Sequence, residues 1–273
     1  MMKVKICNKK LWANFRRIVS AVAAILSLIL TVVDIDQKMR IIISAVIFVI
    51  LVIVFLGMWY IANNTDEKKL KINSSNITIK YGTLFEENGI KVIAFNEYFD
   101  TQVDNKVIAE SSLNGIFISK QSDGARAIDD AIEKEARLKN GVVKENVSRP
   151  YGGKSIKYQL GCICPYGEYF LLAFSHFDDD NKAYISVEDY ISCLMHMWNE
   201  LDTYYAGRPI VLPLLGSGIT RFNNSDITPQ ELLRYIIMTY KASKVKFNNT
   251  ASLTIVLSDK LRDEINLFDI QED

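Results

Sequence analysis

The chain has 273 residues, with 32 basic and 32 acidic side chains, and 49% of its residues are hydrophobic. The long uncharged stretches are concentrated in the first quarter of the chain, which argues against one uniform soluble domain. Beyond Thr65 there are 24 basic and 30 acidic residues, a net charge of −6. Because phosphate contacts need a basic surface, we expect no nucleic-acid partner.

Two uncharged runs near the N-terminus predict transmembrane helices. The second, Ile41 to Ala62, spans roughly 33 Å at ~1.5 Å of rise per residue, enough to cross a hydrocarbon core of about 30 Å. The first, Ile18 to Val33, gives only about 24 Å, so we expect that helix to begin near Trp12, with its arginines reaching the headgroups. We predict spans at 12–33 and 41–62.

Each run has an alternative explanation. A basic start followed by an apolar stretch also describes a cleaved signal peptide, but no small-x-small cleavage site leads into a soluble sequence. The second run would be a buried core helix in a soluble protein, although its length without a charge disfavours that interpretation.

The positions of Lys and Arg predict the orientation of the hairpin. Six basic residues and no acidic one precede the first uncharged run, the connector 34–40 is balanced, and 66–71 has an excess of lysine. Under the positive-inside rule, both termini are cytoplasmic. We expect a multi-pass protein of the plasma membrane with a polar linker at 66–75 and a cytoplasmic domain at 76–273.

The rest of the chain alternates between strand and helix patterns. The pattern predicts, in chain order, strands at 77–81 and 91–95, a helix at 127–138, a hairpin formed by 155–164 and 169–176, a helix after Ser186, a strand at 210–215, a helix after Thr228, a strand at 253–257 and a helix after Ser258. Ser186-Val-Glu-Asp189 and Thr228-Pro-Gln-Glu231 resemble helix caps. The alternation indicates a layered α/β fold with a mixed sheet.

The residue types that bind metals or act as nucleophiles form no convincing cluster. His176 and His196 are isolated, so structural roles are favoured, and Asp178 to Asp180 suits a solvated loop better than an ion site. The cysteines have no metal-ligand spacing and suit a reducing compartment: Cys7, Cys162, Cys164 and Cys193. We predict no catalytic residue, no metal and no resident cofactor.

The most informative stretch is Ile210-Val-Leu-Pro-Leu-Leu-Gly-Ser-Gly-Ile-Thr-Arg221. A buried strand there runs into Gly216-Ser217-Gly218, where glycines allow backbone N–H groups to approach an anion closely. The loop lies at the carboxyl end of a strand, where ligands of α/β sheets bind. A tight turn that needs glycine for geometry alone is the alternative.

Pro213-Leu-Leu-Gly-Ser-Gly-Ile219 resembles the second phosphate loop of macro domains, which bind ADP-ribose. Lys91-Val-Ile-Ala-Phe-Asn96 resembles the strand that leads to the asparagine loop of that family, and Tyr169 to His176 resembles its strand that ends in histidine. The resemblance implies a macro-like three-layer domain with a mixed central sheet, preceded by a transmembrane helical hairpin.

Asn96-Glu-Tyr-Phe-Asp-Thr101 and Ser112-Leu-Asn-Gly-Ile-Phe117 are similar to a bacterial macro-domain subfamily carried behind two transmembrane helices. Its members are effectors of Thoeris-type antiphage defence. The resemblance implies that a partner TIR-domain enzyme makes an ADP-ribose-derived messenger, histidine-ADP-ribose. Binding at the bacterial inner membrane would then cause self-association, damage to membrane lipid and cell death.

Three departures from the wider macro-domain pattern disfavour hydrolysis. Thr83 stands where an aspartate holds adenine, the asparagine loop is reduced to Asn96-Glu97-Tyr98, and a triple-glycine loop is replaced by Ser112-Leu-Asn-Gly-Ile116. A membrane-tethered ADP-ribosyl hydrolase is therefore an alternative that lacks a residue to activate water. A passive membrane-anchored interaction module is the second alternative.

The resemblance implies where the ligand binds. Gly216 to Ile219 and Asn114 to Ile116 would hold the diphosphate, while aromatic residues beside these loops would either stack on the ligand or pack in the core. The predicted ligand-binding residues are Asn96, Phe99, Asp100, Asn114, Gly115, Ile116, Leu215, Gly216, Ser217, Gly218, Ile219, Thr220, Arg221 and Phe222.

Overall fold

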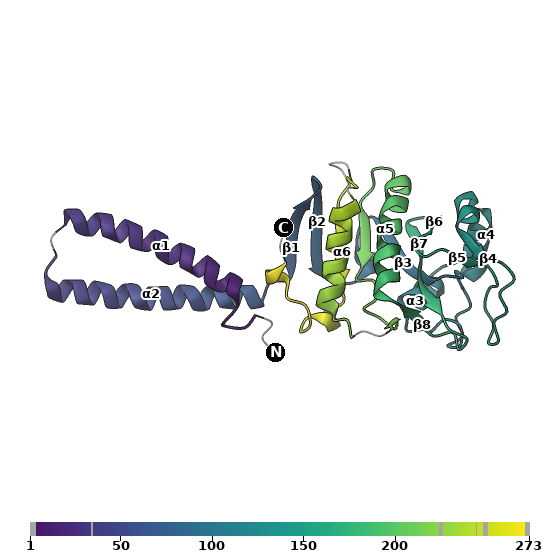
Figure 1. Ribbon diagram of the computed structural model, residues 1–273, viewed down its shortest axis with the longest axis horizontal. Helices are drawn as coiled ribbons and strands as arrows, with labels where there is room; N and C mark the ends of the chain where they lie inside the picture. Colours follow the sequence, from purple (N-terminus) through teal and green to yellow (C-terminus); the bar gives the residue numbers. More distant parts are fainter. Residues whose placement is uncertain (1–3, 34, 224–225, 244, 248–250, 271–273) are drawn as a thin grey trace. The chain divides into compact units, whose positions relative to one another are not determined.

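The computed structural model describes residues 4–33, 35–223, 226–243, 245–247 and 251–270 (Figure 1). The chain divides into two compact units. The first contains Met1–Lys68 and Ile265–Gln271, and the second is built on Lys69–Glu264.

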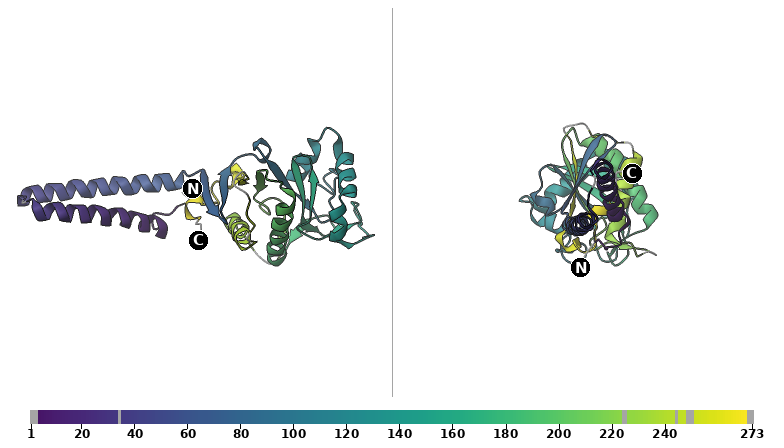
Figure 2. Two further views of the ribbon diagram at one scale, coloured as in Figure 1. Left: turned by 90° about the horizontal axis from the view of Figure 1, so that it is seen from above. Right: turned by 90° about the vertical axis from the view of Figure 1, so that its left-hand side faces the viewer.

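The first unit is a helical hairpin. Helix α1 (Lys9–Val32) and helix α2 (Gln37–Asn63) lie side by side (Figures 1 and 2). Both are long and apolar enough to cross a membrane, and the described residues of their apolar stretches are not buried inside the structure. The helices coincide with the two predicted runs, with differences of a few residues at the ends. Their length and composition suit membrane helices.

The C-terminal segment belongs to this hairpin unit. Asn8 caps α1 by accepting a hydrogen bond from the Leu11 N–H at 3.0 Å, and its Nδ2 donates to both carboxylate oxygens of Asp269 at 2.9 Å. Lys10 Nζ donates to the carbonyl oxygen of Phe268 at 2.7 Å. The segment that contains Phe268 and Asp269 is therefore bound to the start of α1.

The prediction of a helix after Ser258 is wrong. The described chain there forms two short 3-10 turns, η3 (Asp259–Leu261) and η4 (Leu267–Asp269). Asn266 Oδ1 accepts a hydrogen bond from the Phe268 N–H at 3.0 Å, and this local side-chain bond starts a separate turn.

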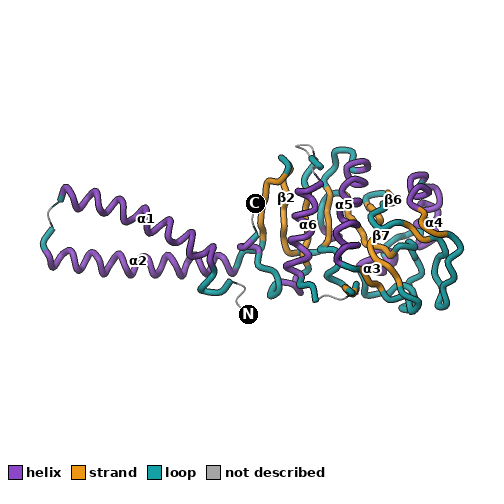
Figure 3. Tube along the Cα trace, viewed as in Figure 1, coloured by secondary structure: helices purple, strands orange, loops and turns teal. Residues whose placement is uncertain are grey.

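The second unit is organised around a mixed sheet with nine described strands (Figure 3). These are β1 (Glu67–Ile72), β2 (Ser75–Tyr81), β3 (Ile90–Asn96), β6 (Ile163–Tyr166), β7 (Tyr169–Phe177), β8 (Ala183–Ile185), β9 (Ile210–Pro213), β10 (Arg221–Phe222) and β11 (Leu253–Leu257). Strands β2, β11, β9, β3 and β7 are parallel neighbours in that order. Strands β6 and β8 pair antiparallel with β7, and β10 pairs with β8.

Helices cover both faces of this sheet. Phe174 of β7 packs against Tyr190 with ring centroids 5.8 Å apart, whereas the adjacent Ala173 lies in the core cluster that contains Phe117 and Ile128. Because side chains alternate along a strand, these contacts lie on opposite faces. The helices are α3 (Leu113–Ser119), α4 (Gly124–Lys134), α5 (Val187–Tyr204) and α6 (Pro229–Ser243). The predicted three-layer α/β arrangement is confirmed.

Several predicted elements are confirmed and others need correction. The four predicted central strands and the helices after Ser186 and Thr228 are present, with both caps formed. The predicted 66–75 linker contains β1, because Leu70 and Ile72 alternate with polar residues and bury one face. The predicted 127–138 helix begins at Gly124 and gives way to a 3-10 segment, η2 (Ala136–Gly141).

The predicted first arm of the 155–164 and 169–176 hairpin is divided. Its second half is β6, which pairs with β7 as expected. Its first half, β5 (Lys157–Tyr158), instead pairs with β4 (Val142–Lys144) in a separate two-stranded sheet. Gly161 lies between the two halves at φ 95°, so the chain turns there and cannot continue as one strand.

Three of the four cysteines are buried in the second unit. Burial raises the pKa of the Cys162 thiol to about 11 and that of Cys164 to about 12, and it raises the pKa of Cys193 further still. Cys7 is exposed. Since the thiolate is the reactive form, the buried thiols are protected both sterically and electrostatically at neutral pH.

We predict that iodoacetamide at pH 8 modifies Cys7 quickly in the folded full-length protein and spares Cys162, Cys164 and Cys193. All four should react at similar rates in denaturant, because burial and its effect on the pKa are then lost. Peptide mass spectrometry after timed quenching measures each rate. Fast modification of Cys193 in the folded protein would contradict the described packing.

Candidate functional site

The carboxyl ends of the central parallel strands lie at one edge of the sheet. Strand β9 pairs with β11 from Ile210 to Pro213, and β3 pairs with β7 from Lys91 to Asn96. Between β3 and β9, the described register contains only Ile90 with Ile210 and Lys91 with Val211. The ladder between these neighbours therefore stops before their carboxyl ends. Ligands of open α/β sheets bind at such a position.

The glycine loop follows β9 directly. Gly216 has φ 84°, a backbone conformation that favours glycine, and a Cβ there would be in tight contact with the Phe222 ring at 3.0 Å. The Tyr190 hydroxyl donates to the Leu215 carbonyl at 3.0 Å, and Ser217 Oγ donates to the Leu214 carbonyl at 2.7 Å. Helix α5 and the loop itself therefore hold this conformation.

Three successive backbone amides follow this support. The N–H groups of Gly218, Ile219 and Thr220 donate no hydrogen bond to another residue within the described parts of the chain. Gly218 and Ile219 are exposed, and the Ile219 side chain is 60% exposed. Consecutive unpaired amides at a strand end are a suitable arrangement for an anion.

The asparagine loop after β3 is held by its own side chains. Asn96 Oδ1 accepts hydrogen bonds from the N–H groups of Tyr98 at 2.9 Å and Asp100 at 3.4 Å, and its Nδ2 donates to Asp100 Oδ2 at 3.0 Å. The Phe99 ring is fully buried against Phe95, with φ 52° for Phe99. The loop is stabilised in this structure by the side chains of Asn96, Phe99 and Asp100. Their contact with a ligand stays a prediction.

A buried ion pair fixes the same loop from another segment. Arg149 Nη1 lies 2.6 Å from Asp100 Oδ2, and the two side chains are 7% and 1% exposed. The Lys154 N–H donates to Asp100 Oδ1 at 2.6 Å, while the Arg149 guanidinium lies 4.2 Å from the Tyr98 ring centroid. Segment 149–154 is thereby attached to the loop that follows β3.

A second buried carboxylate lies beside it. Glu97 is 1% exposed and lies 2.6 Å from His176 Nδ1 and 2.9 Å from Lys157 Nζ. Desolvation acts to lower the pKa of Lys157, but the hydrogen bond and negative charge of Glu97 outweigh it, so the net pKa is raised. Glu97 is occupied by these partners and shielded from solvent, so its carboxylate supports the loop.

The predicted first phosphate loop is the start of α3. Ser112 caps it by accepting from the Gly115 N–H at 2.9 Å, and the Ile116 N–H donates to the Ser112 carbonyl at 2.9 Å. Two amides of the predicted cradle are therefore engaged within the chain. A Cβ at Gly115 would lie 2.3 Å from the Ala109 carbonyl oxygen, so glycine is required here for close packing.

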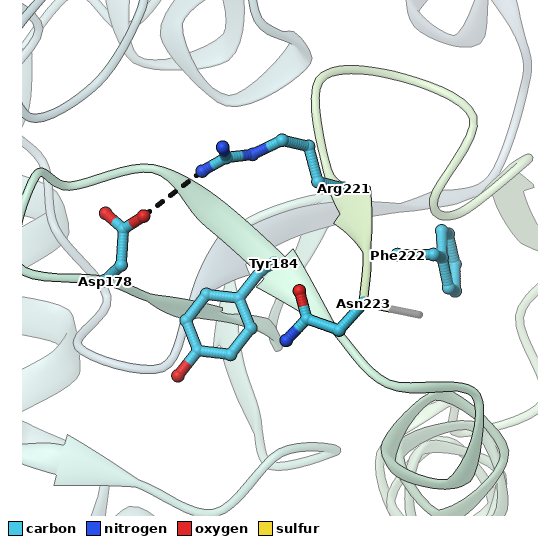
Figure 4. A pocket seen from close by; sticks show the side chains of 5 residues that line it. All are labelled: Asp178, Tyr184, Arg221, Phe222 and Asn223. Carbon is cyan, nitrogen blue, oxygen red and sulfur yellow. Dashed lines mark hydrogen bonds and ion pairs between the residues drawn. The ribbon is translucent and has the colours of Figure 1, made fainter. Parts of the chain in front are cut away.

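Beside the glycine loop, a pocket of about 580 Å³ opens between the β7–β8 connection and β10 (Figure 4). Arg221 Nη2 reaches across to Asp178 Oδ2 at 3.2 Å, Tyr184 and Asn223 form further walls, and Phe222 points to the other side of β10. The sequence pattern indicated Arg221 and Phe222. It did not indicate Asp178, Tyr184 and Asn223. The only feature of the sequence that could have indicated these pocket residues is their position near the ends of strands.

Within the described parts of the chain, no group of three or more His, Cys, Asp and Glu side chains is placed to hold a metal ion. The candidate site is therefore built from backbone amides, two aromatic residues and one exposed ion pair. Such an arrangement can bind a polar anionic molecule.

Residues 77–258 match the family model of the macro domain of Thoeris protein ThsA. The match begins in β2 and ends just after β11, so it includes every strand that ends at the candidate site. The chain is also 38% identical to Thoeris protein ThsA of Bacillus amyloliquefaciens (strain Y2) over 271 residues, covering 95% of this chain and 89% of that protein.

The chain belongs to the Thoeris ThsA family. The predicted macro-like domain is confirmed by this membership. The similarity to the Bacillus ThsA protein covers more of the chain than the macro domain alone, so it extends beyond residues 77–258.

Solved macrodomain structures from Oceanobacillus iheyensis are also similar to this ThsA family member. A mutant form has 13% identity and a TM-score of 0.47, covering 75% of this chain and 94% of that chain. The form with MES bound has 13% identity and a TM-score of 0.44, covering 72% and 90%.

We predict that Arg149→Met destabilises the protein by about 3–5 kcal/mol, because it leaves the buried Asp100 carboxylate without its cation. A second substitution, Asp100→Asn, removes the unpaired negative charge and should restore part of the lost stability. Thermal unfolding of the full-length protein in detergent measures both effects.

Arg137→Met is the matched control, because Arg137 pairs with Glu200 at 3.5 Å while 49% exposed. An exposed pair contributes only about 0–1 kcal/mol, so this variant should unfold near the wild-type temperature. Equal losses for Arg137→Met and Arg149→Met would contradict the assigned role of the buried pair.

Proposed function

We propose that this protein is an antiphage defence effector whose macro domain binds an ADP-ribose derivative, histidine-ADP-ribose, made by a partner TIR-domain enzyme. The observation that carries the proposal is the run of amides at Gly218, Ile219 and Thr220, which donate no hydrogen bond within the described parts of the chain and follow a glycine at positive φ. Membership in the Thoeris ThsA family supports the biological setting.

The glycine loop suits a diphosphate for two reasons. Its unpaired N–H groups are fixed donors, so they need little rearrangement when an anion binds. Arg221 follows them directly in the sequence and adds a positive charge next to the loop. Asn114 to Ile116 would contribute less, because two of those amides already donate to Ser112.

We propose binding without turnover. Hydrolysis of an ADP-ribosyl bond needs a group that activates water, and such a group must reach the water. Glu97 is buried and paired with His176 and Lys157, and Asp100 is buried and paired with Arg149. These carboxylates therefore support the loop, and the ligand serves as a messenger.

The helical hairpin is the proposed output, inserted in the bacterial inner membrane with both termini cytoplasmic. Ligand binding can shift the protein toward a self-associating state only through different affinities for the two states. A shift from 1:99 to 99:1 needs about a 10⁴-fold difference. Small residues on α1 that α2 leaves exposed would allow close packing between copies: Ala21, Ala23, Ala24 and Ser27.

We predict that Gly216→Glu lowers the affinity of the full-length protein for histidine-ADP-ribose at least about 100-fold, equivalent to roughly 2.7 kcal/mol. The new side chain must adopt a strained φ, displace Phe222 and place a negative charge in the loop. Isothermal titration in detergent measures binding, and chromatography of the recovered ligand measures turnover.

Gly167→Glu is the matched control. Gly167 also has positive φ, at 58°, but it lies in the β6–β7 turn and a Cβ there meets no heavy atom within 4 Å. The Gly167→Glu variant should bind histidine-ADP-ribose with the affinity of the wild type. If the wild type binds neither ADP-ribose nor its conjugate, the alternative of a passive membrane-anchored interaction module would be favoured. Breakdown of the ligand would instead favour the alternative of an ADP-ribosyl hydrolase.

We also predict that histidine-ADP-ribose causes release of dye from vesicles that contain the protein. Ala24→Leu should slow release about threefold if it disrupts one interhelical contact of about 0.6 kcal/mol, with Ala45→Leu on α2 as the control. Release without ligand, or equal effects of the two substitutions, would argue against ligand-driven packing through α1.

A further inference from the structure

Two adjacent arginines of α1, Arg16 and Arg17, lie on the outer surface of the hairpin. Both are exposed, and within the described parts of the chain neither guanidinium forms an ion pair or a hydrogen bond. They directly precede the uncharged run that begins at Ile18. In a hairpin inserted in a membrane, the counter-charge for these two side chains would come from the surrounding lipid or water.

Contacts between the two helices show how deep the arginines lie. The Phe55 ring of α2 packs against Trp12 and Phe15 of α1, with ring centroids 4.9 Å and 5.1 Å apart. The helices run antiparallel side by side (Figure 2). Because the arginines follow Phe15 along α1, they lie about one helical turn deeper than these rings, near the level of Val52 on α2.

Beyond that level, α2 stays apolar. Residues 53–62 carry no charge and span about 15 Å at ~1.5 Å of rise per residue. Leu56 and Ile61 are exposed, so this stretch would face lipid. Trp59 donates its indole N–H to the Val4 carbonyl at 2.7 Å, and tryptophan with such a polar contact is typical of the membrane–water interface. The arginines therefore lie about 10 Å deeper than this interface residue.

The two helices consequently differ in hydrophobic length. The uncharged run of α1 spans about 24 Å and that of α2 roughly 33 Å, a difference of about 9 Å. A bilayer that matches α2 would surround two arginines with hydrocarbon, which is costly for charged side chains. The cost falls when the side chains extend toward the headgroups and the bilayer thins locally around them.

Phospholipid phosphate is the partner that guanidinium chemistry favours. A guanidinium presents planar donors that bind a phosphate through two hydrogen bonds, and it stays charged at physiological pH. Successive residues of a helix point about 100° apart, so Arg16 and Arg17 would bind the phosphates of different lipids. Both phosphates would come from the leaflet beside the end of the hairpin where α1 begins.

We propose that Arg16 and Arg17 form a phospholipid-binding site that draws phosphates of the cytoplasmic leaflet toward the membrane interior and thins that leaflet around the hairpin. The inference rests on the proposed insertion of the hairpin with both termini cytoplasmic. It adds a physical route by which the helices disturb a bilayer, because the headgroups move toward the arginines. Several hairpins brought together would enlarge the thinned area.

The test measures the depth of a spin label on α2. Leu56→Cys in a Cys7→Ser background carries the nitroxide, and the full-length protein is reconstituted in vesicles of phosphatidylcholine and phosphatidylglycerol. With both arginines present, the label should be accessible to a water-soluble nickel chelate. With Arg16→Leu and Arg17→Leu, it should lie about 9 Å deeper and be accessible chiefly to oxygen.

Lys5→Gln combined with Lys9→Gln is the matched control, because it also removes two positive charges from exposed residues, here outside the uncharged runs. The label at Leu56 should keep its wild-type depth in this control. Two further conditions identify the ligand. Vesicles of digalactosyl diacylglycerol with the same acyl chains, which lack phosphate, should bury the label. Inorganic phosphate added to the phospholipid vesicles should leave the label where it is.

The outcomes separate this inference from membrane insertion. A deep label with both arginines present, or a shallow one after both leucine substitutions, would overturn the inference while sustaining insertion. A shallow label in the galactolipid, or burial of the label by inorganic phosphate, would overturn the assignment of lipid phosphate as the ligand. A second label at Val49, within the uncharged run of α2, tests insertion itself. Access of the nickel chelate to Val49 would overturn both proposals.

Discussion

The candidate site depends on the way β3 and β9 pair. Their parallel register is described only at Ile90–Ile210 and Lys91–Val211, although each strand has a longer ladder with its other neighbour. The chains that leave their carboxyl ends therefore form two separate loops. One is stabilised by buried charge and the other by glycine geometry, and both lie at the edge of the sheet where ligands of open α/β sheets bind.

The two loops are stabilised by different interactions. After β3, Asp100 and Glu97 are buried carboxylates, and each requires a cation and hydrogen bonds because isolated buried charge is costly. After β9, Gly216 lets the Phe222 ring approach the backbone and leaves the following amides unpaired. The first loop is thus rigid and internally satisfied, while the second retains the capacity to bind an anion.

The hairpin unit is the part of the chain that suits a membrane. Its helices are long and apolar enough for a membrane, and the C-terminal segment is bound to α1 through Asn8 and Asp269. The chain passes between the two units near Lys68 and again near Glu264. The hairpin unit and the macro domain are therefore joined by two covalent connections.

Local patterns in the sequence determined the hairpin helices, the central strands, the capped helices and the glycine loop, because each depends on neighbouring residues and their period. They did not determine β1, the separate pairing of Lys157–Tyr158, or the turns that replace the last helix. They also did not show that Arg149 would neutralise Asp100 or that Asp178 would face Arg221. Those contacts join residues more than 40 positions apart, so only tertiary packing, with the need to pair buried or converging charges, decided them.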